Sequence, residues 1–278
     1  GTAFVALEGT SQIVRLDLAS GSVTDTTFVG GTPRNLSVDP ASDQLLVSMF
    51  VTPLLPNEAT AAPVVESGGV QYGGQVLALD AVSMQQTNVA VLQHSDRNVS
   101  EHSGPGVPNY LGPAVVSPDG TGAWVPSKQD NILAGALRGG QGMTFDQTVR
   151  AVTSKIDLVT GAEAFWARID HDNASVASSA AFGPYGIYLF TTLEGNREVV
   201  VSDAYTATEL LRFDAGRAPQ GVALSADGTR LYVDNFMDRS VSVYDIAALT
   251  GANELEITPL GDVSTVQSET LAPNILNG

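Results

Sequence analysis

One short sequence pattern recurs four times along the chain. The clearest copy is PQGVALSADGTRLYVDNF (219–236), and the pattern returns as RNLSVDPASDQLLVSMF, GPAVVSPDGTGAWVPSK and SSAAFGPYGIYLFTT. Each copy has a short alternating run, a turn rich in Asp, Pro, Gly and Ser, and then a compact apolar run. Turn residues between two such runs predict a β-hairpin. The repeat therefore predicts a chain built from repeated hairpins.

A third predicted strand follows each unit's turn and ends in aspartate. These strands end at Asp17, Asp80, Asp157, Asp203 and Asp245. The last two intervals are about 46 and 42 residues, the size of a four-stranded propeller blade. A more irregular fourth strand closes each unit, as SVTDTTFV, TNVAVL, EAFWARI, ELLRFD and LEITPL. We therefore predict an all-β fold, a single β-propeller domain over residues 1–278 with about five four-stranded antiparallel blades.

The first unit begins at its second strand, TAFVALEG, so one blade is predicted to be incomplete. Either the C-terminal stretch TVQSETLAPNILNG supplies the missing strand and closes a five-blade ring, or the ring continues in chain outside this sequence. An incomplete ring exposes strand edges, and such edges are able to pair two chains into a homodimer.

Charge and composition exclude several functions. The formal net charge is −17 and no basic stretch offsets it, so we expect no nucleic-acid partner. No apolar run reaches the roughly 18 residues of a membrane span, so no membrane insertion is expected. The chain has no cysteine, which excludes disulfides and covalent haem attachment within it. It also lacks the motifs of a serine elbow, a zinc-protease helix, a phosphate loop or an EF-hand.

Three long insertions are predicted to lie on one face of the blades. Residues 52–74 and 131–150 connect second to third strands, and residues 93–108 connect one blade to the next. Strands in a blade alternate in direction, so connections of these two kinds leave from the same end, which we term the loop face. We expect the loop face to bind a partner or ligand, with tolerated surface excursions as the alternative.

The loop face is also predicted to carry the histidines and several basic residues. His94, His102 and His171 are candidate ligands of a transition metal, with solvated loop histidines as the alternative. Basic residues predicted in its loops would receive a small anionic ligand or the carboxylates of a partner. They are Arg34, Lys128, Arg197, Arg217 and Arg239. Acidic residues in the same loops make ordinary ion pairing the alternative: Asp130, Glu194, Asp234 and Asp238.

The segment GRAPQGVALSADGTRLYVDNFMDRSVSVYDI (216–246) resembles the YVTN-repeat propellers of bacterial surface and periplasmic proteins, and this resemblance extends over nearly the whole chain. More specific segments are GVPNYLGPAVVSPDGTGAWVPSKQDNI (106–132), TVRAVTSKIDL, RIDHDN, TTLEGNREVVVSD and LAPNILNG. Together they look like a subgroup of exported proteins that also carry a c-type cytochrome domain of the MauG or di-haem peroxidase kind.

This resemblance implies a periplasmic or cell-surface docking module, with haem only in a neighbouring domain. The most motif-like loop residues are Lys128, Gln129, Asp130, Asn131, Asn235, Met237, Asp238 and Arg239. Hydrogen bonding that holds the ring together is the alternative role for these residues. Asp234 stands where the subgroup often has histidine, which weakens any metal or haem contact carried over to that point.

Two further functions compete with docking. Sugar-lactone hydrolases use the same repeat type, with acid, histidine and arginine groups around the axis. His171 and Arg217 are the first candidates for such chemistry. The second competing function is a propeller that binds a metal through the three histidines. No catalytic constellation is evident, so the leading hypothesis is a non-catalytic module without a cofactor of its own.

Overall fold

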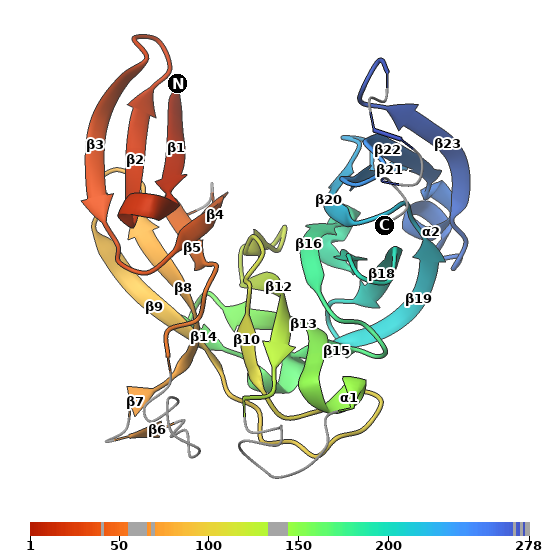
Figure 1. The fold of residues 1–278 in the computed structure, drawn as a ribbon. Helices are drawn as coiled ribbons and strands as arrows, with labels where there is room; N and C mark the ends of the chain where they lie inside the picture. The colour runs from red at the N-terminus through yellow and green to blue at the C-terminus, as the bar shows by residue number, and fades with distance from the viewer. Residues whose placement is uncertain are drawn as a thin grey trace. The chain divides into compact units, whose positions relative to one another are not determined.

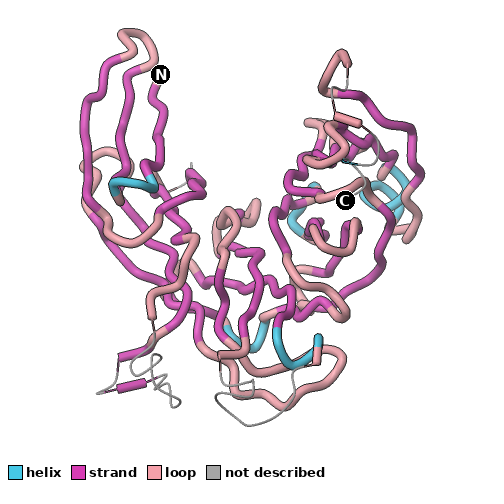
Figure 2. Tube along the Cα trace, in the orientation of Figure 1, coloured by secondary structure: helices cyan, strands magenta, loops and turns pink. Residues whose placement is uncertain are grey.

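The computed structural model describes residues 1–39, 42–54, 66–67, 70–132, 144–268, 271–272 and 275. Five of its sheets are antiparallel with blade topology, and a sixth is the small hairpin of β6 (Glu66–Ser67) and β7 (Val70–Gln71) (Figure 1). Strands dominate the trace in Figure 2, so the predicted all-β propeller fold is confirmed. The chain separates into two compact units, Gly1–Asn173 and Ala174–Gly278, which are described one at a time.

The first sheet of the first unit has three strands in the order β1-β2-β3. They are β1 (Thr2–Leu7), β2 (Gln12–Asp17) and β3 (Ser22–Phe28). These are the predicted second, third and fourth strands, and no first strand accompanies them among the described residues of the unit. The C-terminal stretch that was one predicted source of the missing strand is described only in part.

The second sheet has the complete blade order β4-β5-β8-β9. Its strands are β4 (Pro33–Asp39), β5 (Gln44–Met49), β8 (Gly73–Asp80) and β9 (Gln86–Gln93). The β4–β5 hairpin is the repeat copy predicted over residues 34–50, and Leu36 pairs with Val47 across it.

The third sheet departs from the predicted blade at both edges. Its central strands are β12 (Gly122–Asp130) and β13 (Val149–Asp157), with the short helix α1 (Phe145–Thr148) before β13. The first strand is split into β10 (Val107–Asn109) and β11 (Val115–Val116), which both pair with β12 because β12 is nine residues long. The fourth is split into β14 (Ala162–Glu163) and β15 (Ile169–His171) by the 3-10 turn Phe165–Ala167.

The second unit contains two complete blades. The first consists of β16 (Ala177–Phe182), β17 (Tyr188–Leu193), β18 (Glu198–Asp203) and β19 (Thr208–Asp214). The second consists of β20 (Pro219–Leu224), β21 (Arg230–Asn235), β22 (Ser240–Asp245) and β23 (Thr258–Ser264), with helix α2 (Ala247–Ala252) before β23. The last strand begins three residues later than predicted, because α2 and an irregular segment occupy the intervening chain.

All five predicted third strands end at their predicted aspartates, and the carboxylates explain why. Each accepts a hydrogen bond from the backbone N–H two residues on, which closes the following turn: Asp17, Asp80, Asp157, Asp203 and Asp245. At Asp157 the N–H groups of Thr160 and Val159 both donate at 2.9 Å, and these bonds hold the pKa of the carboxyl below its ordinary value.

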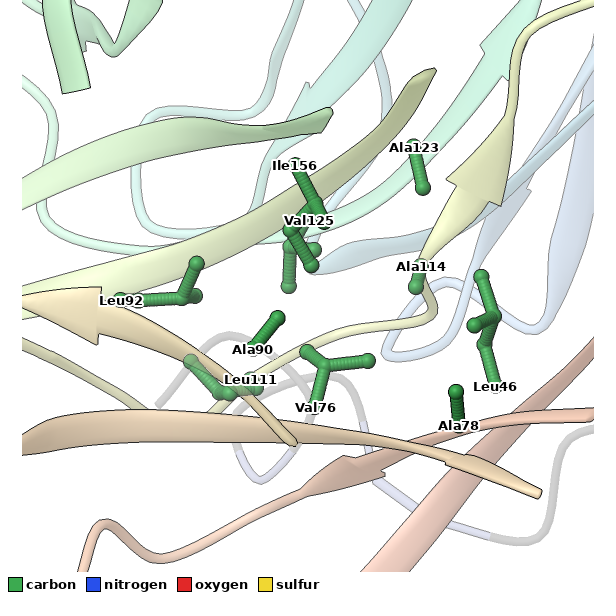
Figure 3. Close-up of a cluster of buried hydrophobic side chains, with 10 residues drawn as sticks. All are labelled: Leu46, Val76, Ala78, Ala90, Leu92, Leu111, Ala114, Ala123, Val125 and Ile156. Atoms are coloured by element: carbon green, nitrogen blue, oxygen red, sulfur yellow. The ribbon is translucent and has the colours of Figure 1, made fainter. Parts of the chain in front are cut away.

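Apolar side chains between neighbouring sheets form the cores. In the first unit, Leu46, Val76 and Leu92 of the second sheet pack against Val125 and Ile156 of the third (Figure 3). In the second unit, the corresponding cluster is built around residues such as Phe190, Val201, Leu231 and Val233. The described part of the chain has no helix long and apolar enough to cross a membrane.

Candidate functional site

The three long insertions leave from the same end of the first unit's sheets, as predicted. They connect β5 to β8, β9 to β10, and β12 to β13. The second and third sheets meet there, where the Thr52 hydroxyl donates to the Pro108 carbonyl at 2.6 Å and the Thr52 N–H donates to Asn109 Oδ1 at 3.0 Å. Parts of the insertions, including the glycine-rich stretch around Gly139, lie outside the described residues.

Four side chains are stacked in sequence on this loop face. The rings of Phe50 and Tyr110 are nearly parallel, with centroids 4.5 Å apart and an interplanar angle of 11°. The guanidinium carbon of Arg34 lies 3.2 Å from the centroid of Phe50, and Lys128 Nζ lies 4.0 Å from the centroid of Tyr110. Arg34, Phe50, Tyr110 and Lys128 together are termed the ladder. A cation beside each of two stacked rings is favourable because an aromatic face carries negative charge density.

The repeat explains how two members of the ladder come together. Phe50 and Lys128 occupy the same position in their copies, at the ends of LLVSMF and AWVPSK. Equivalent positions of neighbouring blades lie at the same end of their sheets. Tyr110 fills the space between them with a backbone φ of 52°, a left-handed conformation that a bulky residue rarely adopts. Strain of this kind is stored most often at functional sites.

Carboxylates orient both cations of the ladder. Glu8 accepts two hydrogen bonds from Arg34, at 3.0 Å from Nε and 2.8 Å from Nη2. Asp130 lies 3.1 Å from Lys128 Nζ and also accepts a bond from Asn109 Nδ2 at 2.9 Å. The predicted pairing of basic residues with acidic neighbours is therefore observed at Lys128, while Arg34 pairs with a carboxylate that was not predicted.

The ladder remains accessible to a partner. Tyr110 is 42% exposed and the Arg34 side chain is also 42% exposed, while Phe50 and Lys128 are partly buried. Val51 and Leu54, which follow Phe50, are exposed apolar residues. The arrangement thus offers aromatic edges, an oriented guanidinium and apolar groups on one surface, which is the composition of a protein-binding hot spot.

Sequence reasoning found Arg34 and Lys128 but missed Glu8, Phe50 and Tyr110. A signal for Phe50 was present, because two of the four repeat copies end in phenylalanine, at Phe50 and Phe236. Tyr110 had no such signal, since it belongs to the break between β10 and β11, which the repeat did not predict.

The predicted placement of Lys128, Gln129 and Asp130 in a loop is wrong. They belong to β12, because the pairing of β12 with β13 continues through Asp130. On the other side, β10 pairs with the same three residues. Gln129 is 2% exposed; its Nε2 donates to the Gly104 carbonyl at 3.0 Å, and its Oε1 accepts from Arg168. Gln129 therefore has a structural role: it joins β12 to the segment between β9 and β10 and to Arg168.

Asn131, which follows β12, has a structural contact of the same kind. Its Nδ2 donates to the Gln147 carbonyl at 2.7 Å, and its backbone N–H donates to Thr148 at 2.9 Å. These bonds close the base of the insertion between β12 and β13. They lie within one sheet, so hydrogen bonding across blades, the alternative role for the motif-like residues, stays a prediction at Asn131.

Buried arginines anchor the segment between β9 and β10. Arg168 pairs with Glu163 at 2.6 Å, and their side chains are 3% and 0% exposed. Arg168 Nη2 also donates to the Gln93 carbonyl at 2.7 Å. Arg150 pairs with Asp170 at 2.7 Å and its Nη2 donates to two carbonyls of the segment, those of residues 100 and 101. This insertion is therefore fixed to the third sheet.

The three histidines have different environments. Both ring nitrogens of His94 are buried without a hydrogen-bond partner, and burial lowers its pKa. His102 is exposed. His171 was predicted in a blade-to-blade loop, which is wrong: it ends β15, is 1% exposed, and its Nε2 lies 2.8 Å from the Thr153 hydroxyl. Among the described residues no three His, Asp or Glu side chains are grouped to hold a metal, so a metal role stays a prediction.

The predicted residues of the second unit form a hydrogen-bonded cluster. Arg217 pairs with Asp238 at 2.5 Å, and the Arg217 N–H donates to the same carboxylate. Asn235 is fully buried at the end of β21 rather than in a loop; its Oδ1 accepts from the Gly216 N–H at 3.0 Å and its Nδ2 donates to the Ser242 hydroxyl at 2.7 Å.

Arg239 completes the turn between β21 and β22 in a left-handed conformation, with φ of 51°. Its carbonyl accepts a hydrogen bond from the Thr265 N–H at 2.8 Å. For Arg34 the loop prediction is also wrong, since it is the second residue of β4. A ligand-binding role for the residues of the second unit stays a prediction.

No family model matches this chain, and no curated protein sequence matches it. Solved structures do resemble it in fold. A hydrazine synthase of Kuenenia stuttgartiensis matches with a TM-score of 0.66 and 18% identity, over 88% of this chain and 68% of that one. The periplasmic gluconolactonase PpgL of Pseudomonas aeruginosa matches with a TM-score of 0.59 and 18% identity, over 97% and 68%.

A protein of unknown function from Desulfotomaculum acetoxidans matches with a TM-score of 0.58 and 11% identity, over 94% of this chain and 66% of that one. This chain thus spans about two thirds of the length of each of these structures. At such low identity the likeness shows the β-propeller fold and does not transfer an activity.

Proposed function

We propose that this chain is a non-catalytic, exported β-propeller that docks a partner domain through the loop face of its first unit. The observation that carries the proposal is the ladder, a half-exposed stack of two rings flanked by two cations. Exposed tyrosine and arginine side chains supply much of the binding energy in protein interfaces. The ladder presents both residue types on one surface, with the Phe50 ring between them.

The ladder is already held in one conformation before any partner binds. Glu8 fixes the Arg34 guanidinium, Asp130 fixes Lys128, and the backbone of Tyr110 is constrained by its neighbours. A side chain that is ordered in the free protein loses little entropy on binding. Such preorganisation on an exposed surface supports binding more than it supports a purely structural role.

The proposed partner is a c-type cytochrome domain of the MauG or di-haem peroxidase kind. One of the segments that resemble that subgroup more specifically, residues 106–132, contains both Tyr110 and Lys128. This chain has no cysteine, so covalently attached haem belongs to the partner. The partner lies on the same gene product or associates with it, in the periplasm or at the cell surface.

The native gene product tests the identity of the partner. It is purified under non-denaturing conditions, and its intact mass and haem absorption are measured. We expect a species much heavier than residues 1–278 with the absorption bands of c-type haem. A haem-free product of about the size of this chain, purified without any associated haem protein, would contradict the cytochrome partner.

A further inference from the structure

A cleft of about 400 Å³ lies in the second unit, between the end of β19 and the β22–β23 hairpin. Its walls include the rings of Phe213 and Tyr244, which meet edge to face with centroids 4.8 Å apart and an interplanar angle of 66°. This volume is in the range of small-molecule sites. The cleft is separate from the ladder, which lies in the first unit.

Three carboxylates line the cleft: Asp214, Asp238 and Asp262. Arg217 neutralises Asp238, with Nε 2.5 Å from Oδ1. Neither Asp214 nor Asp262 forms a salt bridge with any residue in the described part of the chain. The cleft therefore carries two carboxylates whose charge is uncompensated.

Hydrogen bonds fix the position of one of these carboxylates. The Asn235 amide donates to the Ser242 hydroxyl at 2.7 Å, and that hydroxyl donates to Asp262 Oδ1 at 2.5 Å. The Tyr244 hydroxyl donates to the Asp214 carbonyl at 2.8 Å, which places its ring against the wall. Burial raises the pKa of Tyr244, and the nearby charges of Asp262 and Asp214 raise it further.

We infer that this cleft binds a small organic cation, an ammonium group with an apolar body. Aromatic faces attract such cations, and uncompensated carboxylates supply the opposite charge. Among the described residues no arginine or lysine lines the cleft, which favours a cation over an anion. The aromatic pair in its wall and its volume of about 400 Å³ distinguish this open cleft from a cluster of acidic residues on a flat surface.

Choline and its neutral isostere 3,3-dimethyl-1-butanol are the probes that test the inference. Both are titrated into the 278-residue chain by calorimetry at about 0.15 M salt, where long-range attraction to an acidic surface is screened. We expect saturable binding of choline at one site. The isostere, which has the same shape without the charge, is expected to bind at least about tenfold more weakly.

Two matched variants locate the site. Asp262→Asn removes one uncompensated charge from the cleft and is expected to weaken choline binding about tenfold. Asp234→Asn removes the same charge from an exposed position of β21 outside the cleft, and is expected to leave the affinity within about twofold. Both residues are exposed, so both variants retain the fold.

Three outcomes would overturn the inference. They are the absence of saturable heat with choline, equal affinity for choline and its isostere, and equal loss of affinity in the two variants. The last result would indicate binding through the net charge of the surface rather than in the cleft. None of these results bears on docking through the ladder, which is tested separately.

Discussion

The ring of Tyr110 stacks on the ring of Phe50, although they follow strands of two different blades. The stack therefore joins the second and third sheets at the loop face. Tyr110 has a left-handed backbone conformation, and 42% of the residue is exposed. A contact that served stability alone would be expected to bury more of the ring.

The conformation of Tyr110 gives a test of the strain at the ladder. Tyr110→Ala and Tyr110→Gly both remove the ring, but only glycine adopts a φ of 52° without steric cost. We expect Tyr110→Gly to be about 1 kcal/mol more stable than Tyr110→Ala. Urea unfolding followed by tryptophan fluorescence measures this in the first unit, because Trp124 and Trp166 both lie there. Equal stability, or a more stable alanine variant, would show that the position is unstrained.

The Arg168–Glu163 pair gives a second prediction, because both side chains are buried. Arg168→Met leaves the Glu163 carboxylate buried without its partner and is expected to destabilise the first unit by about 3–5 kcal/mol. The double variant Arg168→Met with Glu163→Leu removes both charges of this pair and is expected to recover most of that loss. Urea unfolding by tryptophan fluorescence measures both variants. A double variant no more stable than Arg168→Met would contradict this account.

His94 predicts how the stability of the first unit depends on pH. Burial lowers its pKa below 6.5, so the unfolded chain binds more protons than the folded protein. The stability that neutral His94 contributes is present above pH 6.5 and is lost as the pH falls towards its folded pKa. His94→Leu is expected to flatten the fall in the midpoint of thermal unfolding between about pH 7 and pH 5.

The control for this measurement is His102→Gln, which removes an exposed histidine of the same segment. It is expected to keep the wild-type pH profile. A His94→Leu profile as steep as the wild type would mean that other groups cause the loss of stability in acid.

The turn between β20 and β21 gives a fourth prediction. The hydroxyl of Ser225 donates to Asp227 at 2.6 Å, and this bond, with those from Thr229, lowers the pKa of Asp227 to about 2. The bonds to the ionised carboxylate therefore persist above pH 3.8 and are lost as the pH falls towards 2. Ser225→Ala is expected to raise this pKa towards its ordinary value. The carboxyl carbon shift of Asp227, followed by NMR titration, measures it, and an unchanged titration would rule out the hydroxyl as the cause.

The hairpins and the five strand-ending aspartates were predictable because their causes are local. Asp157, for example, closes its turn by accepting from the N–H groups of Val159 and Thr160, so the pattern is visible in the sequence. The same holds for Ser225 and Asp227 within one turn. An aspartate that closes the turn after the third strand recurs in every blade.

The features of the structure that differ from the sequence prediction have non-local causes. The extension of β12 to Asp130 depends on β10 and β13 pairing with its two edges, and β10 lies far from β13 in the sequence. Tyr110 lies in the break between β10 and β11, the two short strands that pair with this long β12. The buried pair of Arg168 and Glu163 likewise requires the fold before its two members meet. The members of the ladder were therefore identifiable only in part before the structure.

Cross-linking of the native gene product through its lysines tests docking at the ladder most directly. The chain has only two lysines: Lys128 belongs to the ladder, and Lys155 lies in β13 near its other end, beside Trp124. An amine-reactive cross-linker followed by peptide mass spectrometry is expected to join Lys128, and not Lys155, to a haem-bearing partner. Cross-links from Lys155 alone, with Lys128 modified only as a free amine, would contradict the proposal that the ladder is the docking site.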